Sequence, residues 1–167
     1  MGFFSKDIKT IDDLFVHTLQ DIYYAENKIL NSLPDMIEQA SDPQLKQAFQ
    51  KHLGETRNHT KRLEDVFRMH GAAPKAIDCQ AIDGIVAEAQ DVAGEVENQR
   101  VMDAALVAAA QAVEHYEIAR YGTLIAWAKQ LGRNDCANLL EQTLMEEKSA
   151  DQKLTSLAEL YVNRKAA

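Results

Sequence analysis

The sequence predicts an all-α fold, in which four long helices form a bundle and a long crossover joins the second helix to the third. Three observations support this prediction. The 167 residues include only 7 glycines and 3 prolines, too few turn-forming residues for an all-β fold. Alanine is abundant, whereas β-branched and aromatic residues are few, which favours helices. Apolar residues recur at steps of three and four along four long segments.

The first predicted helix covers residues 11–40 and follows a loose arm of residues 1–9. Thr10, followed by Asp13, has the spacing of an N-terminal cap. The apolar stripe that comes next repeats at helical intervals. Pro34 removes a backbone hydrogen bond and clashes one turn back, so we expect it to kink this helix or to end its first part.

The second predicted helix covers residues 43–69. Ser41 and Asp42 offer a capping side chain, and Pro43 then occupies the first turn, which is typical of a helix start. Gly71 and Pro74 follow the last apolar position and should end the helix.

The segment of residues 71–98 is too long for a tight turn. We expect it to be a crossover that carries one short helix, near residues 83–90. The third long helix is predicted over residues 99–131 and the fourth over residues 135–162, with Asn134 or Asp135 as its cap.

The order of these segments predicts how the helices pack. Short turns join the first helix to the second and the third to the fourth, so each of these pairs should run antiparallel. One long crossover between the second and third helices is the ferritin-like topology. Nothing in the sequence marks a linker, so residues 1–167 are expected to form a single ferritin-like bundle domain.

Composition excludes several classes of partner. The formal net charge of −8 and the pI near 5.1 predict that the chain binds neither nucleic acid nor an anionic membrane surface. No stretch of about 18 apolar residues is present. Cys79 and Cys136 are too few for a disulfide framework and too far apart for a metal knuckle, which favours a cytoplasmic protein with reduced thiols.

Seven polar side chains fall inside the apolar stripes, where charged residues are unusual. Each lies 14 to 18 residues from the nearer short turn, at residues 41–42 or 132–133. At a rise of about 1.5 Å per residue, all seven lie within roughly one helical turn of a common level. They are Glu26 on the first helix, Glu55 and His59 on the second, Glu114 and Glu117 on the third, and Glu147 and Asp151 on the fourth.

Acidic groups that converge inside a bundle need a neutralising partner, because burial of an isolated carboxylate is costly. The stripes offer no lysine or arginine at this level, and His59 is the only clear nitrogen. We therefore predict two iron or manganese ions per chain, bridged by carboxylates, with zinc possible as a substitute. The alternative is that the individual acids are structural or lie on the shoulders of the stripes.

Three nearby side chains are expected to play lesser parts. Glu146 is rotated by about 100° from Glu147 and should lie nearer the outside of the bundle. Asp151, if it is not a ligand, would hydrogen-bond to one, and His52 could support the ligands in the same way.

Several motifs recur together along nearly the whole chain. They are Thr10-Ile-Asp-Asp-Leu-Phe15, Asp21-Ile-Tyr-Tyr-Ala-Glu26, Leu33-Pro34, His52-Leu-Gly-Glu55-Thr56, Arg62-Leu63-Glu64, Glu114-His-Tyr-Glu117-Ile-Ala-Arg-Tyr121-Gly122 and Glu146-Glu147-Lys148. As a set, these motifs resemble the YciF/YciE ferritin-like proteins, a bacterial stress-associated family. The resemblance implies a homodimer with a carboxylate-rich dimetal site and a role in cytoplasmic stress response. It supports the five glutamates as metal ligands, whereas His59 stands four residues after Glu55 and not the three that are usual in ferritins.

Three functions are consistent with these features. The first is a dimetal protein that reacts with peroxide or dioxygen, because acidic ligands favour the higher oxidation states of iron and manganese. The second is a non-enzymatic stress protein that binds metal for stability or acts as an interaction scaffold. The third, iron storage in a hollow shell, is disfavoured because alanine-rich helix faces fit a dimer more easily than a cage.

Overall fold

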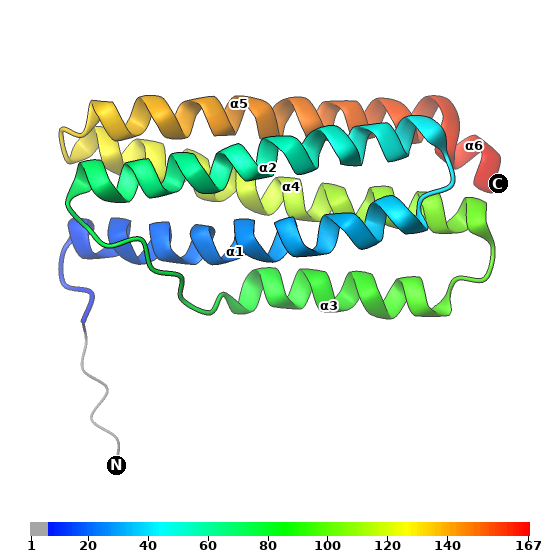
Figure 1. Cartoon of the computed structure of the whole chain (residues 1–167), viewed down its shortest axis with the longest axis horizontal. Coiled ribbons are helices and arrows are strands. Elements are labelled where there is room, and N and C mark those ends of the chain that lie inside the picture. The colour runs from blue at the N-terminus through cyan, green and yellow to red at the C-terminus, as the bar shows by residue number, and fades with distance from the viewer. Residues whose placement is uncertain (1–6) are drawn as a thin grey trace, which may run out of the picture.

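The computed structural model describes residues 7–167 and consists of helices and their connections, with no strand in that range. The first six residues of the predicted N-terminal arm lie outside the described part. Four long helices form the bundle (Figure 1). They are α1 (Ile11–Gln39), α2 (Pro43–His70), α4 (Gln99–Gln130) and α5 (Asn134–Leu157).

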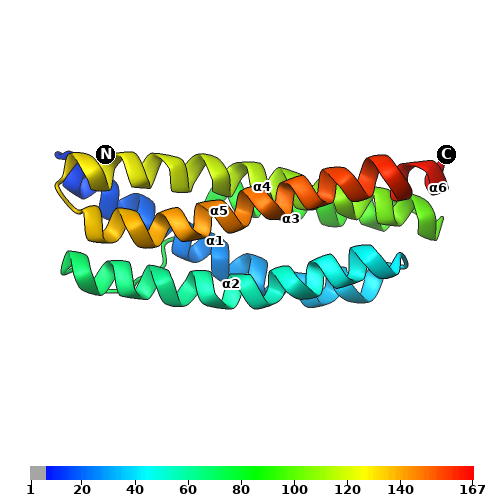
Figure 2. The same ribbon diagram turned by 90° about the horizontal axis from the view of Figure 1, so that it is seen from above.

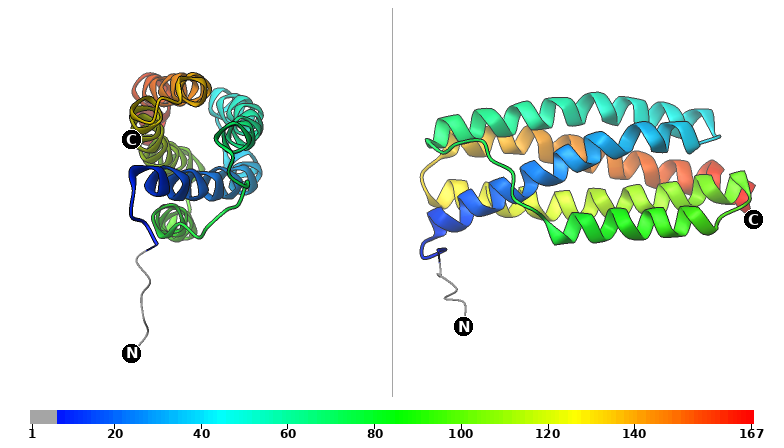
Figure 3. Two further views of the ribbon diagram at one scale, coloured as in Figure 1. Left: turned by 90° about the vertical axis from the view of Figure 1, so that its left-hand side faces the viewer. Right: turned by 60° about the horizontal axis from the view of Figure 1, so that its bottom comes forward.

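The four helices pack as a closed square in which α1 contacts α2 and α4, and α5 contacts α2 and α4. The end-on view shows this arrangement, with α3 (Gln80–Glu95) outside the square (Figure 3). Helix α3 packs mainly on α4 and carries the chain back along the bundle, so α2 and α4 run in the same direction. These features confirm the predicted ferritin-like topology with a long crossover.

Local signals place most of the helix ends. Thr10 and Asp13 form a capping box at the start of α1, and the Asp42 side chain caps α2, with Pro43 in the first turn. Gly71 and Gly132 follow α2 and α4 with φ of 81° and 73°, a left-handed conformation in which glycine has no steric penalty.

The start of α5 differs from the prediction. The residue at its N-cap is Arg133, which makes no side-chain capping bond. Asp135 instead accepts hydrogen bonds from the Arg133 guanidinium, at 2.8 and 3.0 Å. The first turn of α5 is therefore held by an ion pair at the surface and not by an Asn or Asp cap.

The crossover helix is about twice as long as predicted. Helix α3 has 16 residues, because Ile82 and Val86 bury an apolar stripe and the helix continues through Gly84 and Gly94. Tertiary packing thus overrides the low helix propensity of glycine. Similarly, α1 continues past Pro34 to Gln39, so this proline does not end the helix.

The fourth long helix changes character near the C-terminus. Helix α5 ends at Leu157 and is followed by a π-helical segment, η1 (Ala158–Val162), and a short helix, α6 (Asn163–Ala166). Viewed from above, this end of the chain lies beside the start of α4 (Figure 2). No helix within residues 7–167 combines the length and the apolar character needed to cross a membrane.

Candidate metal centre

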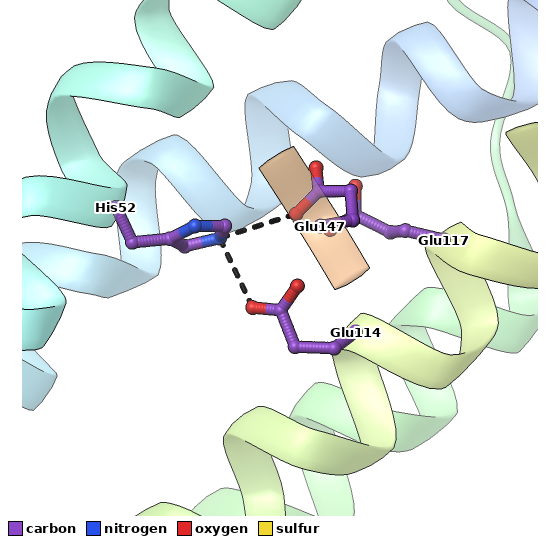
Figure 4. A group of neighbouring side chains, drawn as sticks. All are labelled: His52, Glu114, Glu117 and Glu147. Atoms are coloured by element: carbon purple, nitrogen blue, oxygen red, sulfur yellow. Dashed lines mark ion pairs between the residues drawn. The ribbon is translucent and has the colours of Figure 1, made fainter. Parts of the chain in front are cut away.

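Two overlapping groups of buried acidic and imidazole side chains lie inside the bundle. Figure 4 shows the first of them. In each group, the candidate ligand atoms all lie within 4.8 Å of one another. Glu147 belongs to both groups and links them, which is the arrangement expected of a carboxylate that bridges two ions. The first group is His52, Glu114, Glu117 and Glu147, and the second is Glu26, His59 and Glu147.

The helical repeat directs these side chains inward. His52 and His59 are seven residues apart on α2, which places them two turns apart on one face. Glu114 and Glu117 are three residues apart on α4 and share the face that contains Leu106 and Ala110. Helices α1 and α5 contribute one glutamate each, from the middle of their buried stripes.

In the first group, the His52 ring points toward two carboxylates. Its Nε2 atom lies 3.2 Å from Oε1 of Glu114 and 3.9 Å from Oε2 of Glu147. Both ring nitrogens are buried and make no hydrogen bond among the described residues. In the neutral ring one nitrogen carries a proton, and the other is available to bind a cation.

In the second group, His59 lies between interior and peripheral carboxylates. Its Nδ1 atom lies 2.9 Å from Glu147 and 3.3 Å from Glu26, and its Nε2 atom lies 2.8 Å from Oε2 of Glu146. Arg62 contacts both oxygens of Glu146, at 2.6 and 2.9 Å. Glu26, which faces Nδ1 of His59, also accepts a hydrogen bond at its Oε1 atom from the Tyr121 hydroxyl.

Several buried oxygen atoms of these residues have no hydrogen-bond partner among residues 7–167, which is a sign that they suit a metal ion. Buried polar atoms are normally hydrogen-bonded, and an unpaired one is costly. Both carboxylate oxygens of Glu117 are buried, as are both of Glu147, and none has a hydrogen-bond partner among residues 7–167. Glu26 and Glu114 each have one such oxygen. These acceptors face one another across the centre, and a shared cation would satisfy them together.

The proton affinities of the carboxyl groups reflect the same crowding. Burial, with the negative charge of Glu147, raises the pKa of Glu114 to about 9. Burial and the charges of Glu26 and Glu147 raise the pKa of Glu117 well above its ordinary value. Burial also raises the pKa of Glu147, although His59 opposes this effect. Without a cation, these acids therefore tend to hold protons.

His59 shows the opposite response. Burial disfavours the charged ring, but the carboxylates of Glu26 and Glu147 outweigh this effect and raise the pKa of His59 to about 11. In the metal-free protein, His59 is thus the cation that partly neutralises the centre. A metal ion would replace the proton on its Nδ1 atom.

The structure brings together five of the seven residues predicted from the sequence, and it leaves Glu55 and Asp151 outside both groups. Glu55 pairs with Lys51 and lies 3.8 Å from Nδ1 of His52, contacts that lower its pKa to about 2, with His52 the larger cause. Asp151 faces the outer side of the bundle, where it contacts His115 at 3.1 Å and Gln111 at 3.1 Å. The five that meet are Glu26, His59, Glu114, Glu117 and Glu147.

Two expectations about neighbouring residues are revised. His52 was expected to support the ligands, but it lies inside the first group, only 7% exposed. A signal was present in the sequence, because His52 continues the stripe of Phe49, Thr56 and His59 on α2. Glu146 is partly exposed, as expected, yet it also contacts His59 directly.

Comparison with known proteins shows which family the chain resembles. Residues 10–167 match the model of a family described as a domain of unknown function, DUF892. Protein YciF of Escherichia coli (strain K12) is 45% identical over 161 residues, which span 96% of this chain and 97% of that protein.

Solved structures show the same fold. The crystal structure of the E. coli stress protein YciF has a TM-score of 0.89 at 45% identity and covers 93% of this chain and 99% of that chain. YcfI from Rhodopseudomonas palustris has a TM-score of 0.90 at 53% identity, covering 92% and 98%. A ferritin-like, diiron-carboxylate protein from Bacillus anthracis has a TM-score of 0.69 at 16% identity, covering 90% and 99%, and shares the fold.

Proposed function

This chain belongs to the DUF892 family, and we propose that it is a dinuclear metal protein that binds two iron or manganese ions in a bacterial stress response. The observation that carries this proposal is the carboxylate of Glu117. It is completely buried, both its oxygens lack hydrogen-bond partners among the described residues, and three other carboxylates lie nearby. A structural acid would have a donor or a basic partner in this position.

The charges of the centre support two divalent ions. The two groups contain four carboxylates and two imidazoles, and four negative charges balance those of two divalent cations. Glu147 would contribute to holding both ions, because it belongs to both groups and neither of its oxygens has a hydrogen-bond partner within residues 7–167. Glu26 and His59 would be the remaining ligands of one ion. The remaining ligands of the other ion would be His52, Glu114 and Glu117.

The ligand types favour iron or manganese over zinc. Oxygen ligands outnumber nitrogen ligands, and no cysteine among residues 7–167 belongs to either group. Structural zinc sites instead use mainly Cys and His. Carboxylate-rich sites inside four-helix bundles of this topology commonly hold pairs of iron or manganese ions.

When bound, two such ions would supply the electrons for reaction with peroxide or dioxygen, and the chain's own side chains would prepare the site. Glu146 accepts a hydrogen bond from Nε2 of His59. The Nδ1 atom of the same ring is thereby left to hold a metal ion. Tyr121 donates to Glu26 and fixes that carboxylate. The interior packing keeps bulk water from the Glu117 side of the centre.

Elemental analysis of protein purified without added metal tests this proposal. We expect close to two iron or manganese ions per chain, and a loss of most of them in the Glu147→Ala variant. Protein that retains no iron or manganese, and takes up neither when each is supplied anaerobically, would refute the dimetal assignment.

A second measurement separates an enzyme from a scaffold. Metal-loaded protein is given hydrogen peroxide, and peroxide consumption is compared with that of the Glu147→Ala variant. Consumption only by the loaded wild-type protein supports the oxidoreductase. Full metal occupancy with no consumption of peroxide or dioxygen supports the non-enzymatic alternative. The homodimer and the cytoplasmic location implied by the family resemblance are further proposals, and light scattering tests the first of them.

A further inference from the structure

A cavity of about 1070 Å³ extends from the metal centre toward the turn between α1 and α2. All five helices α1 to α5 contribute to its wall. Most of the lining is apolar, including Leu33, Phe49, Leu106 and Leu154. Its volume is slightly above the usual range of small-molecule sites, about 300–1,000 Å³.

The cavity exists because the two sides of the metal centre are packed differently. Toward the α4–α5 turn, the next layer contains the fully buried side chains of Ile22, Leu63 and Tyr121. Toward the α1–α2 turn, three helices instead place alanine one turn from a residue of the centre. These are Ala48 before His52, Ala110 before Glu114, and Ala150 after Glu147.

Polar groups gather where this cavity meets the metal centre. His52, Glu55 and Glu114 form part of its wall, so the cavity borders the His52 group. Lys51 on α2 and Lys153 on α5 also line it, and both lysines are exposed to solvent. Lys51 pairs with Glu55, whereas Lys153 makes no ion pair among residues 7–167. The same cavity thus has an apolar interior and one cationic side chain, that of Lys153, available at its surface.

We propose that this cavity is a binding site for a long aliphatic carboxylate, a ligand of the fatty-acid class, whose chain lies along the alanine-lined interior and whose carboxylate lies beside Lys153. The length of the wall fits such a chain, because Gln44 and Glu55, both lining residues, are separated by about 16 Å along α2. Apolar burial supplies the affinity, and Lys153 selects the acidic end group.

This inference goes beyond the proposed function, since the site is built from this chain's side chains and requires no metal ion to form. A ligand in the cavity would nevertheless cover the His52 side of the centre, so the two sites are adjacent. Metal binding and carboxylate binding can therefore be measured separately, and the failure of one leaves the other open.

Calorimetric titration with sodium dodecanoate tests the proposal, using the full chain both metal-free and metal-loaded. We expect one dodecanoate per chain, with affinity that falls about tenfold for each two methylenes removed from the ligand. Ala110→Leu fills the cavity and should weaken binding at least tenfold. Ala112→Leu, at an exposed position on the same helix, is the matched control and should bind like the wild type.

The charged end of the ligand has its own test. Lys153→Gln should weaken dodecanoate binding severalfold and leave the binding of 1-dodecanol unchanged, because the alcohol carries no charge. Metal content, measured by elemental analysis, should be the same in the wild type and in these three variants. If Ala110→Leu does not fold, Ala150→Leu fills the same space from α5.

Two results would overturn the proposal. One is the absence of dodecanoate binding to the wild-type protein, or equal binding by the cavity-filled variants. The other is a dimer that Ala110→Leu converts to monomers, with no dodecanoate bound in either form, because a second copy of the chain would then cover the cavity.

Discussion

The imidazole of His59 is held by Glu146, whose Oε2 atom lies 2.8 Å from Nε2 of the ring. Arg62 binds the same carboxylate through both its terminal nitrogens and, against the effect of burial, keeps the pKa of Glu146 below its ordinary value. Glu146 therefore stays charged and fixes the ring orientation. Because its contact is on the outer nitrogen, the inner nitrogen faces Glu26 and Glu147.

Glu146→Ala should weaken metal binding without abolishing it. The ring of His59 would lose its outer partner and its preferred tautomer, and removal of such a contact typically lowers metal affinity about 10- to 100-fold. Titration with Mn²⁺ followed by calorimetry measures the change. Glu141→Ala, which removes an exposed carboxylate on the same helix, is the control and should leave the affinity unchanged. An equal loss in both variants would contradict the role of Glu146.

Glu147→Ala should reduce bound metal more than Glu55→Ala does. Glu147 belongs to both groups, whereas Glu55 lies outside them and pairs with Lys51. We expect Glu147→Ala to lose most of its iron or manganese and Glu55→Ala to retain most of it, as measured by elemental analysis. A larger loss of metal in Glu55→Ala than in Glu147→Ala would show that Glu55 is a ligand, as the sequence predicted.

Glu117→Gln should stabilise the metal-free protein while it weakens metal binding. Burial raises the pKa of Glu117 well above its ordinary value, so the metal-free folded chain has to take up a proton that the unfolded chain does not hold at neutral pH. Glutamine has nearly the same shape and needs no proton. We expect a gain of about 1–3 kcal/mol in the free energy of unfolding without metal, because one pKa unit corresponds to about 1.4 kcal/mol. Thermal melts in the presence of a chelator, paired with elemental analysis, measure both effects. A destabilised metal-free variant would show that Glu117 is a structural acid.

The metal-free protein should lose stability as the pH rises from about 4.5 to 9. Folding raises the pKa of Glu114 from 4.5 to about 9, so between these values only the folded state holds the proton. Each such group lowers the free energy of unfolding by about 1.4 kcal/mol per pH unit.

His59 acts in the same direction. Its pKa rises from 6.5 to about 11 on folding, so its contribution is complete below about pH 6.5 and is lost as the pH rises through 11. Melting temperatures measured at several pH values in a chelator test both effects. Metal ions replace the protons, so loaded protein should show a much flatter profile. An equally steep decline with metal bound would contradict this account.

Asp103→Ala should destabilise the fold without changing the metal centre. Asp103 is buried on α4 and accepts hydrogen bonds from the backbone of Ser41 and Asp42 and from the Ser41 hydroxyl, at 2.6 to 3.0 Å. Loss of these charge-assisted bonds leaves the buried backbone amide of Asp42 unpaired and should cost about 2–4 kcal/mol. Urea unfolding measures the loss, with Asp91→Ala at an exposed position on α3 as the control. A loss of metal at full stability would instead link Asp103 to the centre.

The common level of the acids could be predicted because helix rise is nearly constant. Counting residues from two short turns placed Glu26 on α1 and Glu147 on α5 at the same depth, and in the structure both belong to the second group. Helix starts were predictable where a side chain caps its own backbone, as at Thr10. The full length of α3 could not be predicted, because this helix gains its stability from packing on α4.

The sequence by itself determined the helical fold, the crossover topology and the depth at which acids gather, because these depend on periodicity and spacing along single segments. Only the tertiary structure decided that His52 and not Glu55 enters the centre, since the two lie three residues apart on α2 and the rotation of that helix depends on its neighbours. The cavity beside the centre was likewise invisible in the sequence. Alanine on a buried face can mark close helix contact or open space, and only the positions of the surrounding helices distinguish the two.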